Sequence, residues 1–378
     1  MVFLAAYMTA LNTIQLKPVF KLGQPDDSHK FLPLPAPSGE YPYHLSIEKI
    51  IPHINHSKIV FHVLGDTGSV RDPDTIRVVA AEMAKQYNGL DQPHFLYHLG
   101  DIVYNHGEAE RYEQQFLSPY KQYPAPIFAI AGNHDSDVNP ANPVPYQSLD
   151  AFTKVFCDTI PRPVNFGGKT DKMSMIQPNI YWTLKTPLFN IIGLHSNVPK
   201  FGVITSEQRA WFIEELRTHN KERPEKALFV CLHHAPYSAD VNHGSSLPMI
   251  NFLEGAFEET GIIPDLVLSG HVHNYQRFNK AYDNKVLTYV VAGAGGFDEL
   301  HAVALPGDER FTSDNQLFDQ VNLVNYCDLK HGFLNIAVEK DASGLIITGN
   351  YYCLTKEEQT DRIGEAVLAD QFAIRINA

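Results

Sequence analysis

Five hydrophobic runs of the sequence end in side chains that can bind metal ions. Each run is rich in β-branched or aromatic residues and leads directly into aspartate, asparagine or histidine. The ends read GDTG at 65–68, GDIVY at 100–104, GNHD at 132–135, HHAP at 233–236 and GHVHNY at 270–275. In α/β sheets, ligands bind outside the carboxyl ends of the strands, and glycine permits the sharp turns that let side chains converge. The repeated pattern therefore predicts one metal site built by five loops.

Each of these motifs alone has an ordinary structural explanation. A Gly-Asp pair after a strand is most often part of a turn. A single His-x-His is more often surface histidine, and Asn133 could cap the turn that follows it. The recurrence of such ends in five successive runs favours convergence on metal ions, because aspartate and histidine together supply the ligand types that metal sites need.

Strands and helices that would position these loops alternate along the chain, as in a layered α/β domain. We expect strands at 58–64, 94–99, 126–131, 189–194, 226–232 and 265–270. Amphipathic spacing predicts helices at 73–87 and 206–218, the second capped by Thr205 or Ser206. The stretch 332–354 is typical of two strands joined by a turn at 341–344.

Two stretches break this alternation. Prolines are scattered through 18–57, which disfavours long helices, so we expect residues 1–57 to be an irregular segment packed on a single domain at 58–378. Residues 136–178 are rich in proline, asparagine and glycine. Long loops inside compact domains are usually functional, so we expect this one to wall or gate the site.

Composition restricts the class of protein and its partners. The chain has 378 residues, 44% hydrophobic and 19% charged, which is globular and large enough to bury a core without metal staples. A net charge of -13 argues against nucleic acid, which needs clustered lysine and arginine. It does not exclude a small phosphorylated substrate, because bound cations would dominate the local field. We expect no membrane helix, since no run approaches about 18 apolar residues.

Cysteine usage and the first residues leave the compartment open. Cys157, Cys231, Cys327 and Cys353 form no CxxC pair, so neither a zinc knuckle nor a disulfide framework is predicted. The apolar start lacks a basic region and a clear cleavage site, so a signal peptide is the less favoured reading. We expect a soluble protein, with the cytoplasm slightly favoured over secretion or the periplasm, and make no prediction of oligomeric state.

In this order, the motifs resemble those of the calcineurin-like metallophosphoesterases, and among them the purple acid phosphatases. The family order is GDxG, GDxxY, GNH followed by an acid, a strand-end histidine, and GHxHxYxR, which this chain completes at Arg277. The resemblance covers about residues 58–355. It implies an α/β fold in which a layered β-sandwich of two mixed sheets is flanked by helices.

One position separates the subfamilies. Most relatives carry histidine two residues after the first aspartate, where this chain has Gly68. In the purple phosphatases a tyrosine placed like Tyr104 replaces that ligand, and a hard phenolate suits trivalent iron better than imidazole does. A packed tyrosine is the ordinary alternative.

Carried over residue by residue, the resemblance implies a site for two metal ions. The implied ligands are Asp66, Tyr104 and His273 for the first ion, Asn133, His234 and His271 for the second, and Asp101 as a bridge. Such a bridge holds two cations at about 3.5–4 Å. The implied pair is iron(III) with iron(II), zinc(II) or manganese(II).

Several other histidines follow the same runs. We favour His234 over His233 as the ligand, because the family pattern is His-x-Pro and Pro236 follows at that spacing. His233 is then expected to point to the other strand face and to be structural. His134 and His243 are candidate catalytic residues that could bond phosphoryl oxygens or protonate the leaving oxygen, and exposed loop histidines are the alternative. The role of His195 is left open.

The resemblance implies an acid phosphatase that hydrolyses phosphomonoesters by attack of a metal-bound hydroxide. A divalent-metal phosphodiesterase or nucleotide hydrolase of the same fold is the first alternative. A catalytically silent protein that keeps its metals as structural clips is the second. The expected partner is a small phosphorylated substrate, without nucleic acid or membrane. The sequence contains neither a GxSxG elbow nor a GxxxxGK loop, which argues against serine hydrolysis and nucleotide cradling.

Overall fold

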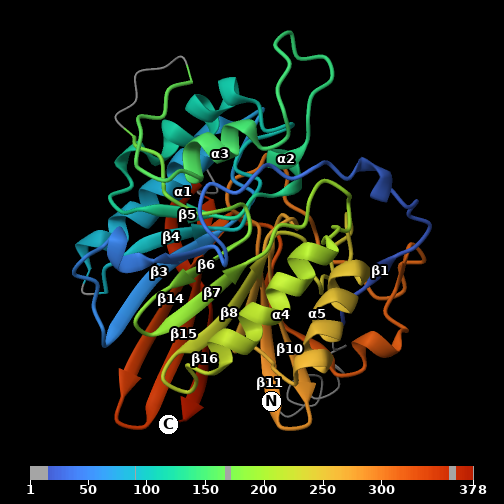
Figure 1. The fold of residues 1–378 in the computed structure, drawn as a ribbon. Coiled ribbons are helices and arrows are strands. Elements are labelled where there is room, and N and C mark those ends of the chain that lie inside the picture. Colours follow the sequence, from blue (N-terminus) through green and yellow to red (C-terminus); the bar gives the residue numbers. More distant parts are fainter. Residues whose placement is uncertain (1–15, 90, 167–171, 357–362, 378) are drawn as a thin grey trace, which may run out of the picture.

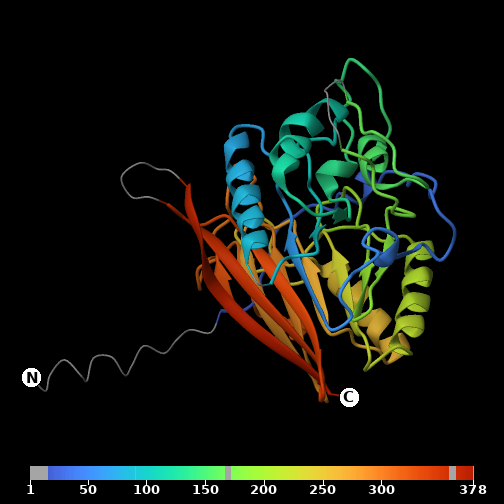
Figure 2. The ribbon, with the colours of Figure 1, turned by 90° about the vertical axis from the view of Figure 1, so that its left-hand side faces the viewer.

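Two mixed β-sheets packed face to face form the centre of the protein (Figures 1 and 2). The computed structural model describes residues 16–89, 91–166, 172–356 and 363–377. From edge to edge, the eight-stranded sheet consists of β13 (Val321–Cys327), β10 (Tyr275–Tyr282), β11 (Lys285–Ala292), β9 (Leu266–Ser269), β8 (Ala227–Leu232), β7 (Phe189–Gly193), β6 (Trp182–Lys185) and β2 (His44–Ser46). The six-stranded sheet consists of β16 (Ile363–Asn377), β15 (Gly344–Lys356), β14 (Gly332–Asp341), β3 (Lys58–Leu64), β4 (Phe95–His98) and β5 (Ile127–Ala129). This confirms the predicted sandwich of two mixed sheets.

Parallel pairing places the predicted loops at common edges. In one sheet β3, β4 and β5 are parallel neighbours, and in the other β7, β8 and β9 are. The carboxyl ends of parallel neighbours meet at one edge, so the loops after these strands are brought together. The predicted strand pair at 332–354 is the antiparallel hairpin of β14 and β15.

Aromatic side chains fill the space between the two sheets. The ring of Phe61 on β3 stacks on Phe95 of β4 at 4.8 Å between centroids, and on Phe189 of β7 in the opposite sheet at 5.1 Å. Trp182 of β6 lies 5.9 Å from Phe128 of β5. Strands buried on both faces need continuous hydrophobic sequence, which explains the unbroken runs that the sequence shows.

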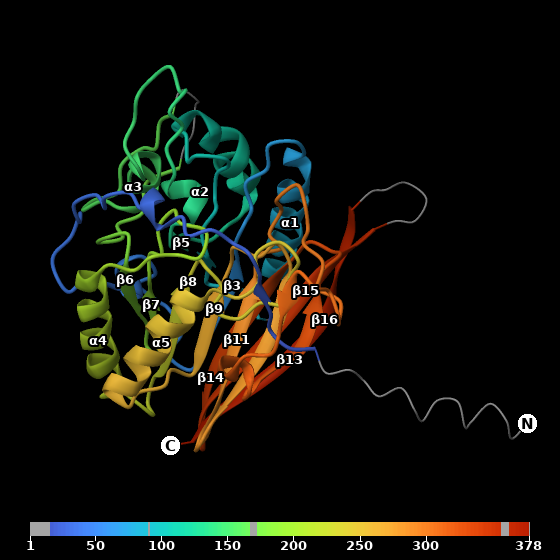
Figure 3. The ribbon, with the colours of Figure 1, turned by 90° about the vertical axis from the view of Figure 1, so that its right-hand side faces the viewer.

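Helices cover the outer faces of the sheets and the strand ends. Figure 3 shows α4 (Ser206–Asn220) and α5 (Leu247–Thr260) side by side outside the eight-stranded sheet. α1 (Pro73–Lys85) contacts β14 and β16 of the other sheet, and α2 (Asn133–Ser136) and α3 (Asp150–Phe156) lie above the strand ends (Figure 1). The hydroxyl of Thr205 accepts a hydrogen bond from the Gln208 backbone N–H, so Thr205 is the N-cap of α4.

Shorter elements complete the described chain. β1 (Phe20–Lys21) pairs with β12 (Phe311–Thr312) in a separate two-stranded sheet. One-turn 3₁₀ segments lie at Ser28–Lys30, Ile47–Lys49, Gln86–Asn88, Ala109–Arg111, Pro119–Gln122 and Gln316–Phe318, and a π-helical turn lies at Glu113–Leu117. In the part of the chain that the structure describes, no helix is both long and apolar enough to cross a membrane.

The two stretches expected to be irregular contain some regular structure. The segment 16–57 includes β1 and β2, and β2 is the edge strand of the eight-stranded sheet. The stretch 136–178 contains α3 and a bridge between Pro163 and Met173. Residues 1–15, which hold most of the apolar start considered as a signal peptide, lie outside the described residues. The division into an N-terminal segment and a domain at 58–378 stays a prediction.

Candidate metal centre

The backbone at three predicted ligands has a conformation that side chains rarely adopt. Asp66, Asp101 and His271 have φ angles of 59°, 54° and 67°, in the left-handed region. Such a conformation costs a non-glycine residue on the order of 1–3 kcal/mol and is found mainly at functional sites. Each of the three follows a glycine that ends a strand run, so the turn directs the side chain into the space between the loops.

The Tyr104 hydroxyl lies among three other predicted ligands. Its oxygen is 3.0 Å from Oδ2 of Asp101, 3.4 Å from Oδ1 of Asp66 and 3.2 Å from Nε2 of His273. Tyr104 is buried, as are the two aspartates. The structure therefore brings together all four side chains that were expected around the first metal ion and its bridge.

The residues expected around the second ion form an adjacent group. Oδ1 of Asn133 lies 3.0 Å from Nδ1 of His271, and the rings of His234 and His271 are 4.2 Å apart between centroids. The Nε2 atoms of His234 and His271 are buried and have no hydrogen-bond partner among the described residues. Buried polar atoms are rarely left unpaired, so these nitrogens fit a site that a cation completes.

His233 does not point away from this group. Its Nδ1 lies 2.8 Å from the Leu99 carbonyl, and its Nε2 lies 3.1 Å from Oδ1 of Asn133 and 3.3 Å from Oδ2 of Asp101. The strand alternation that was expected to separate His233 from His234 does not apply, because β8 ends at Leu232. Ligand atoms of Asp101, His233 and His271 all lie within 4.8 Å of one another, so His233 also borders the site.

Burial sets the protonation of the site. It lowers the pKa of His234, His271 and His273 well below the usual range, which leaves these imidazoles in the neutral form that binds metals. Burial also raises the pKa of Tyr104 well above its usual range, and the charges of Asp101 and Asp66 raise it further. The phenolate would therefore need a strongly acidic cation beside it.

Gly68 leaves the space that the Tyr104 ring occupies. A Cβ atom at position 68 would lie 2.8 Å from Cδ2 of Tyr104, 2.8 Å from the Ile102 carbonyl and 2.6 Å from Oε1 of Gln115. Real Cβ contacts are not that short, so a side chain at 68 and the tyrosine cannot both be accommodated in this arrangement. The position of the Tyr104 ring therefore depends on glycine at position 68.

Two polar residues for which we predicted no role hold the ligand loops in place. Gln115 accepts a hydrogen bond from the Tyr104 backbone N–H at 2.7 Å and donates one to its carbonyl at 3.0 Å. Asp135 accepts from the backbone N–H groups of Ile102, Val103 and Gly132. Asp135 is visible in the sequence as the acid of GNHD. No local sequence pattern marks Gln115, because its hydrogen bonds with the Tyr104 backbone form only when the chain is folded.

The two candidate catalytic histidines lie beside different parts of the centre: His134 beside the residues expected around the first ion, and His243 beside those expected around the second. His134 is half-buried, its Nδ1 lies 2.7 Å from the Asn105 carbonyl, and its ring is 4.3 Å from that of Tyr104. The His243 ring is 4.1 Å from that of His271, and burial lowers the pKa of His243 to about 3. The backbone N–H of His243 donates to Asp240, which fixes its loop.

His195, whose role the sequence left open, is held in place through its backbone. It is buried, its backbone is bonded on both sides by the Gln208 amide, and burial lowers its pKa to about 4. Among the described residues, no hydrogen bond or ring contact joins His195 to a predicted ligand.

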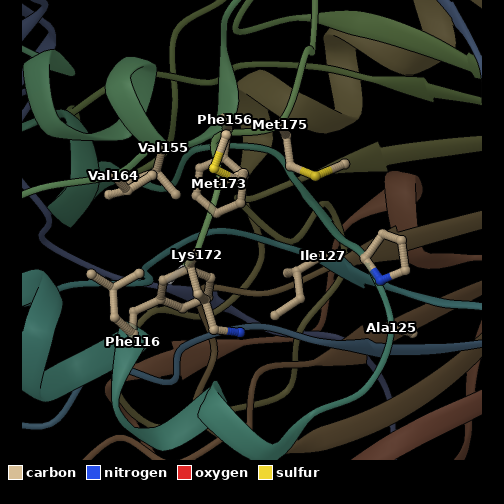
Figure 4. Close-up of a pocket in the computed structure, with 11 residues that line it drawn as sticks. Phe116, Ala125, Ile127, Val155, Phe156, Val164, Lys172, Met173 and Met175 are labelled. Carbon is tan, nitrogen blue, oxygen red and sulfur yellow. The ribbon is translucent and has the colours of Figure 1, made fainter. Parts of the chain in front are cut away.

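An apolar cavity of about 210 Å³ lies between β5, α3 and the turns at 113–122 (Figure 4). It is lined by Phe116, Leu117, Ala125, Pro126, Ile127, Val155, Phe156, Val164, Lys172, Met173 and Met175. None of the predicted ligands or catalytic histidines is among these residues. The cavity is therefore separate from the centre.

Comparisons with known proteins agree with this geometry. The family model described as calcineurin-like phosphoesterase matches residues 59–275. Purple acid phosphatase 1 of Ipomoea batatas is 28% identical over 268 residues, which cover 64% of this chain and 50% of that protein. The chain thus spans about half the length of that curated relative.

Two solved structures show the same fold. GAP50, described as the anchor in the inner membrane complex of Plasmodium, has a TM-score of 0.55 at 14% identity, over 85% of this chain and 89% of that chain. Purple acid phosphatase PPD1 from yellow lupin (Lupinus luteus) has a TM-score of 0.55 at 16% identity, over 84% of this chain and 53% of that chain.

Proposed function

The chain belongs to the calcineurin-like phosphoesterase family, and from that premise we propose that it is a purple acid phosphatase-like enzyme acting on small phosphomonoesters. Its family supports metal-dependent hydrolysis of phosphoesters in general. The finer proposal is that one of two bound ions is iron(III), that the other is iron(II), zinc(II) or manganese(II), and that activity is highest under acidic conditions.

The position of the Tyr104 hydroxyl carries this proposal. It lies within 3.0–3.4 Å of Asp101, Asp66 and His273, where a histidine at position 68 would act in most relatives. A hard phenolate oxygen beside two carboxylates is a ligand set that suits a trivalent hard cation. The close approach of Gly68 to the Tyr104 ring supports a built tyrosine position over a tyrosine that merely fills space.

The side chains present fit two ions. The first would be held by Asp66, Tyr104 and His273, the second by Asn133, His234 and His271, with Asp101 between them. When bound, such a pair supplies Lewis acidity that activates water and offsets charge on the phosphoryl group.

The remaining polar groups of the site act on the substrate in this proposal. His134 is half-buried beside Tyr104, and its Nδ1–H donates to the Asn105 carbonyl, so Nε2 donates a hydrogen bond to a phosphoryl oxygen when the imidazole carries both protons. His243 lies beside His271, and its Nδ1 is buried without a partner among the described residues. That nitrogen is free to bond a phosphoryl or leaving-group oxygen.

A divalent-metal phosphodiesterase is the second candidate, and one observation favours it. Burial and the neighbouring carboxylates raise the pKa of Tyr104, which opposes formation of the phenolate. If the first ion is only a weak acid, the tyrosine stays protonated and binds it poorly. The choice therefore depends on the ion that the protein acquires.

The visible absorption spectrum of the oxidised, purified protein and of its Tyr104→Phe variant tests the proposal. We expect a phenolate-to-iron(III) charge-transfer band that the variant lacks, together with faster turnover of para-nitrophenyl phosphate than of its bis ester. A metal-loaded wild-type protein without colour, with the opposite ester preference, would instead establish the divalent phosphodiesterase.

A further inference from the structure

A second cluster of metal-ligating side chains lies between the edge strand β2 and helix α4. His44 is the first residue of β2, and Glu215 and His219 lie one turn apart on α4. Their ligand atoms all lie within 4.8 Å of one another. β2 is three strand positions from β8, roughly 14 Å across the sheet, so this cluster is distinct from the centre described above.

We propose that His44, Glu215 and His219 bind a zinc-type divalent cation. Nε2 of His44 lies 2.9 Å from both carboxylate oxygens of Glu215, and Nε2 of His219 lies 3.2 Å from Oε2 of the same carboxylate. Zn–N and Zn–O bonds of about 2.0–2.2 Å place neighbouring ligands of a tetrahedral site roughly 3.3 Å apart. The spacing of these atoms is therefore close to that of a zinc ligand set.

The second ring nitrogen of His219 has the partner that metal-bound histidines usually have. Its Nδ1 lies 2.9 Å from Oε2 of Glu222, and that carboxylate also accepts a hydrogen bond from the Asn190 side chain at 2.6 Å. A carboxylate on the far nitrogen fixes the tautomer so that the other nitrogen presents its lone pair to the metal. In this tautomer, Nε2 of His219 faces the Glu215 carboxylate.

A lone pair that faces a carboxylate oxygen at 3.2 Å is repelled unless a positive charge lies with it. The charge is either a second proton on His219 or a cation shared by His219, Glu215 and His44. Glu215 and His219 are buried, whereas 22% of the His44 side chain is exposed. Two carboxylates flank His219: Oε2 of Glu215 lies 3.2 Å from its Nε2, and Oε2 of Glu222 lies 2.9 Å from its Nδ1.

A divalent cation balances the negative charge of two carboxylates better than a single proton does. Lys226, 3.3 Å from Glu222, lies beside only one of the two carboxylates that flank His219. Binding of the cation by neutral imidazoles would release any proton held on His219.

A path for the cation and a place for water are also present. His44 lines a surface depression together with Ser46, Lys185 and Thr186, among others. Three protein ligands of the His₂Glu type with one open position are a known zinc arrangement. The open position here would face the depression, because His44 is the exposed member of the set.

Zinc content of the full-length protein tests the inference. After equilibration with buffered zinc and removal of excess metal, His44→Gln should hold one zinc fewer per chain than the wild type. His56→Gln, on the rim of the same depression but outside the cluster, should hold as many as the wild type. Glu222→Gln should bind this zinc roughly 10- to 100-fold more weakly, an effect that loss of packing alone would not confine to one ion.

Anomalous diffraction at the zinc edge supplies the second readout. A peak between His44, Glu215 and His219 supports the site, whereas equal zinc content in wild type and His44→Gln with no such peak shows that a proton occupies it. The measurement is independent of the proposed function. Failure of the phosphatase centre to bind metal lowers the zinc content of both proteins equally and leaves their difference unchanged.

Discussion

The Nε2 atom of His233 lies 3.3 Å from Oδ2 of Asp101, the carboxylate expected to bridge two metal ions. The neighbouring His234 instead has its Nδ1 2.7 Å from the Ser196 hydroxyl and its Nε2 without a partner among the described residues. Both imidazoles therefore lie in the same centre, but they differ in how many of their ring nitrogens have a partner among the described residues. His233 is already engaged on both nitrogens, whereas His234 has one nitrogen to give to a metal ion.

This difference predicts unequal effects of the two alanine variants on metal content. His234→Ala should lose one of two metal ions per chain, because it removes the nitrogen proposed as a ligand. His233→Ala should still bind two ions at saturating metal, with affinity or activity weakened roughly 10- to 100-fold, because it removes a group that positions Asp101. Metal analysis of both variants after reconstitution measures these contents. Loss of one ion from His233→Ala but not from His234→Ala would show that His233 is the ligand and His234 the positioning residue.

A second prediction concerns the space beside Tyr104. Gly68→Ala should destabilise the protein by about 1–3 kcal/mol, because its Cβ would overlap the Ile102 carbonyl, Gln115 and the tyrosine ring. Urea unfolding measures this change. Gly255→Ala in α5 is the control, since its Cβ has no neighbour closer than 4.0 Å and alanine suits a helix. Equal stability of the Gly68 variant and wild type would mean that the tyrosine position is not built around the glycine.

The third prediction assigns His134 to catalysis. His134→Ala should lower kcat for para-nitrophenyl phosphate by about 100-fold or more, within the range for loss of a proton-transfer group, with metal content unchanged. His106→Ala is a matched control: its Nδ1 contacts Asp137 at 2.8 Å, and it lies outside the predicted ligand set. A His134 variant with full metal content and wild-type kcat would rule out the catalytic role.

The parts of the fold that were predictable are those with strong local patterns. β3 and β8 are hydrophobic on both faces, so their runs mark them as buried strands within a residue or two. β16 was missed, because it lies at the edge of its sheet and many of its side chains face solvent. Its placement depends on antiparallel pairing with β15, which no local signal announces.

The same limit applies to the candidate sites. Glycine-flanked aspartate and histidine after strands are visible in sequence, so the residues around Asp66 and Asp101 could be selected in advance. The cluster of His44 and Glu215 joins residues 171 positions apart, and the bond from Gln115 to Tyr104 depends on a π-helical turn. Such contacts are determined by tertiary packing, which residue type and spacing alone do not encode.

The last prediction concerns an ion pair that joins the two sheets. Arg277 of β10 donates to Asp370 of β16 at 2.7 and 3.0 Å, and the carboxylate also accepts from Tyr275 at 2.6 Å. Burial would raise the pKa of Asp370, but hydrogen bonds from Arg277, Tyr275 and Asn325 lower it below the usual value. A carboxyl whose folded pKa is lowered stabilises the protein above its unfolded pKa of about 3.9, and this stabilisation is lost as pH falls through the folded pKa.

Asp370→Asn should therefore lower the free energy of unfolding by about 2 kcal/mol near neutral pH, less than the 3–5 kcal/mol for a fully buried pair, since the Arg277 side chain is 11% exposed. The difference between wild type and variant should shrink as pH falls from about 4 through the folded pKa, because the carboxyl of the unfolded chain is protonated first and the folded carboxylate only at lower pH. Urea unfolding of both proteins between neutral and acidic pH measures it. Asp308→Asn, whose Arg310 partner is on the surface two residues away, should leave the free energy of unfolding nearly unchanged, because solvent screens exposed ion pairs. A difference that stays constant down to strongly acidic pH would show that Asp370 acts through packing and not through its charge.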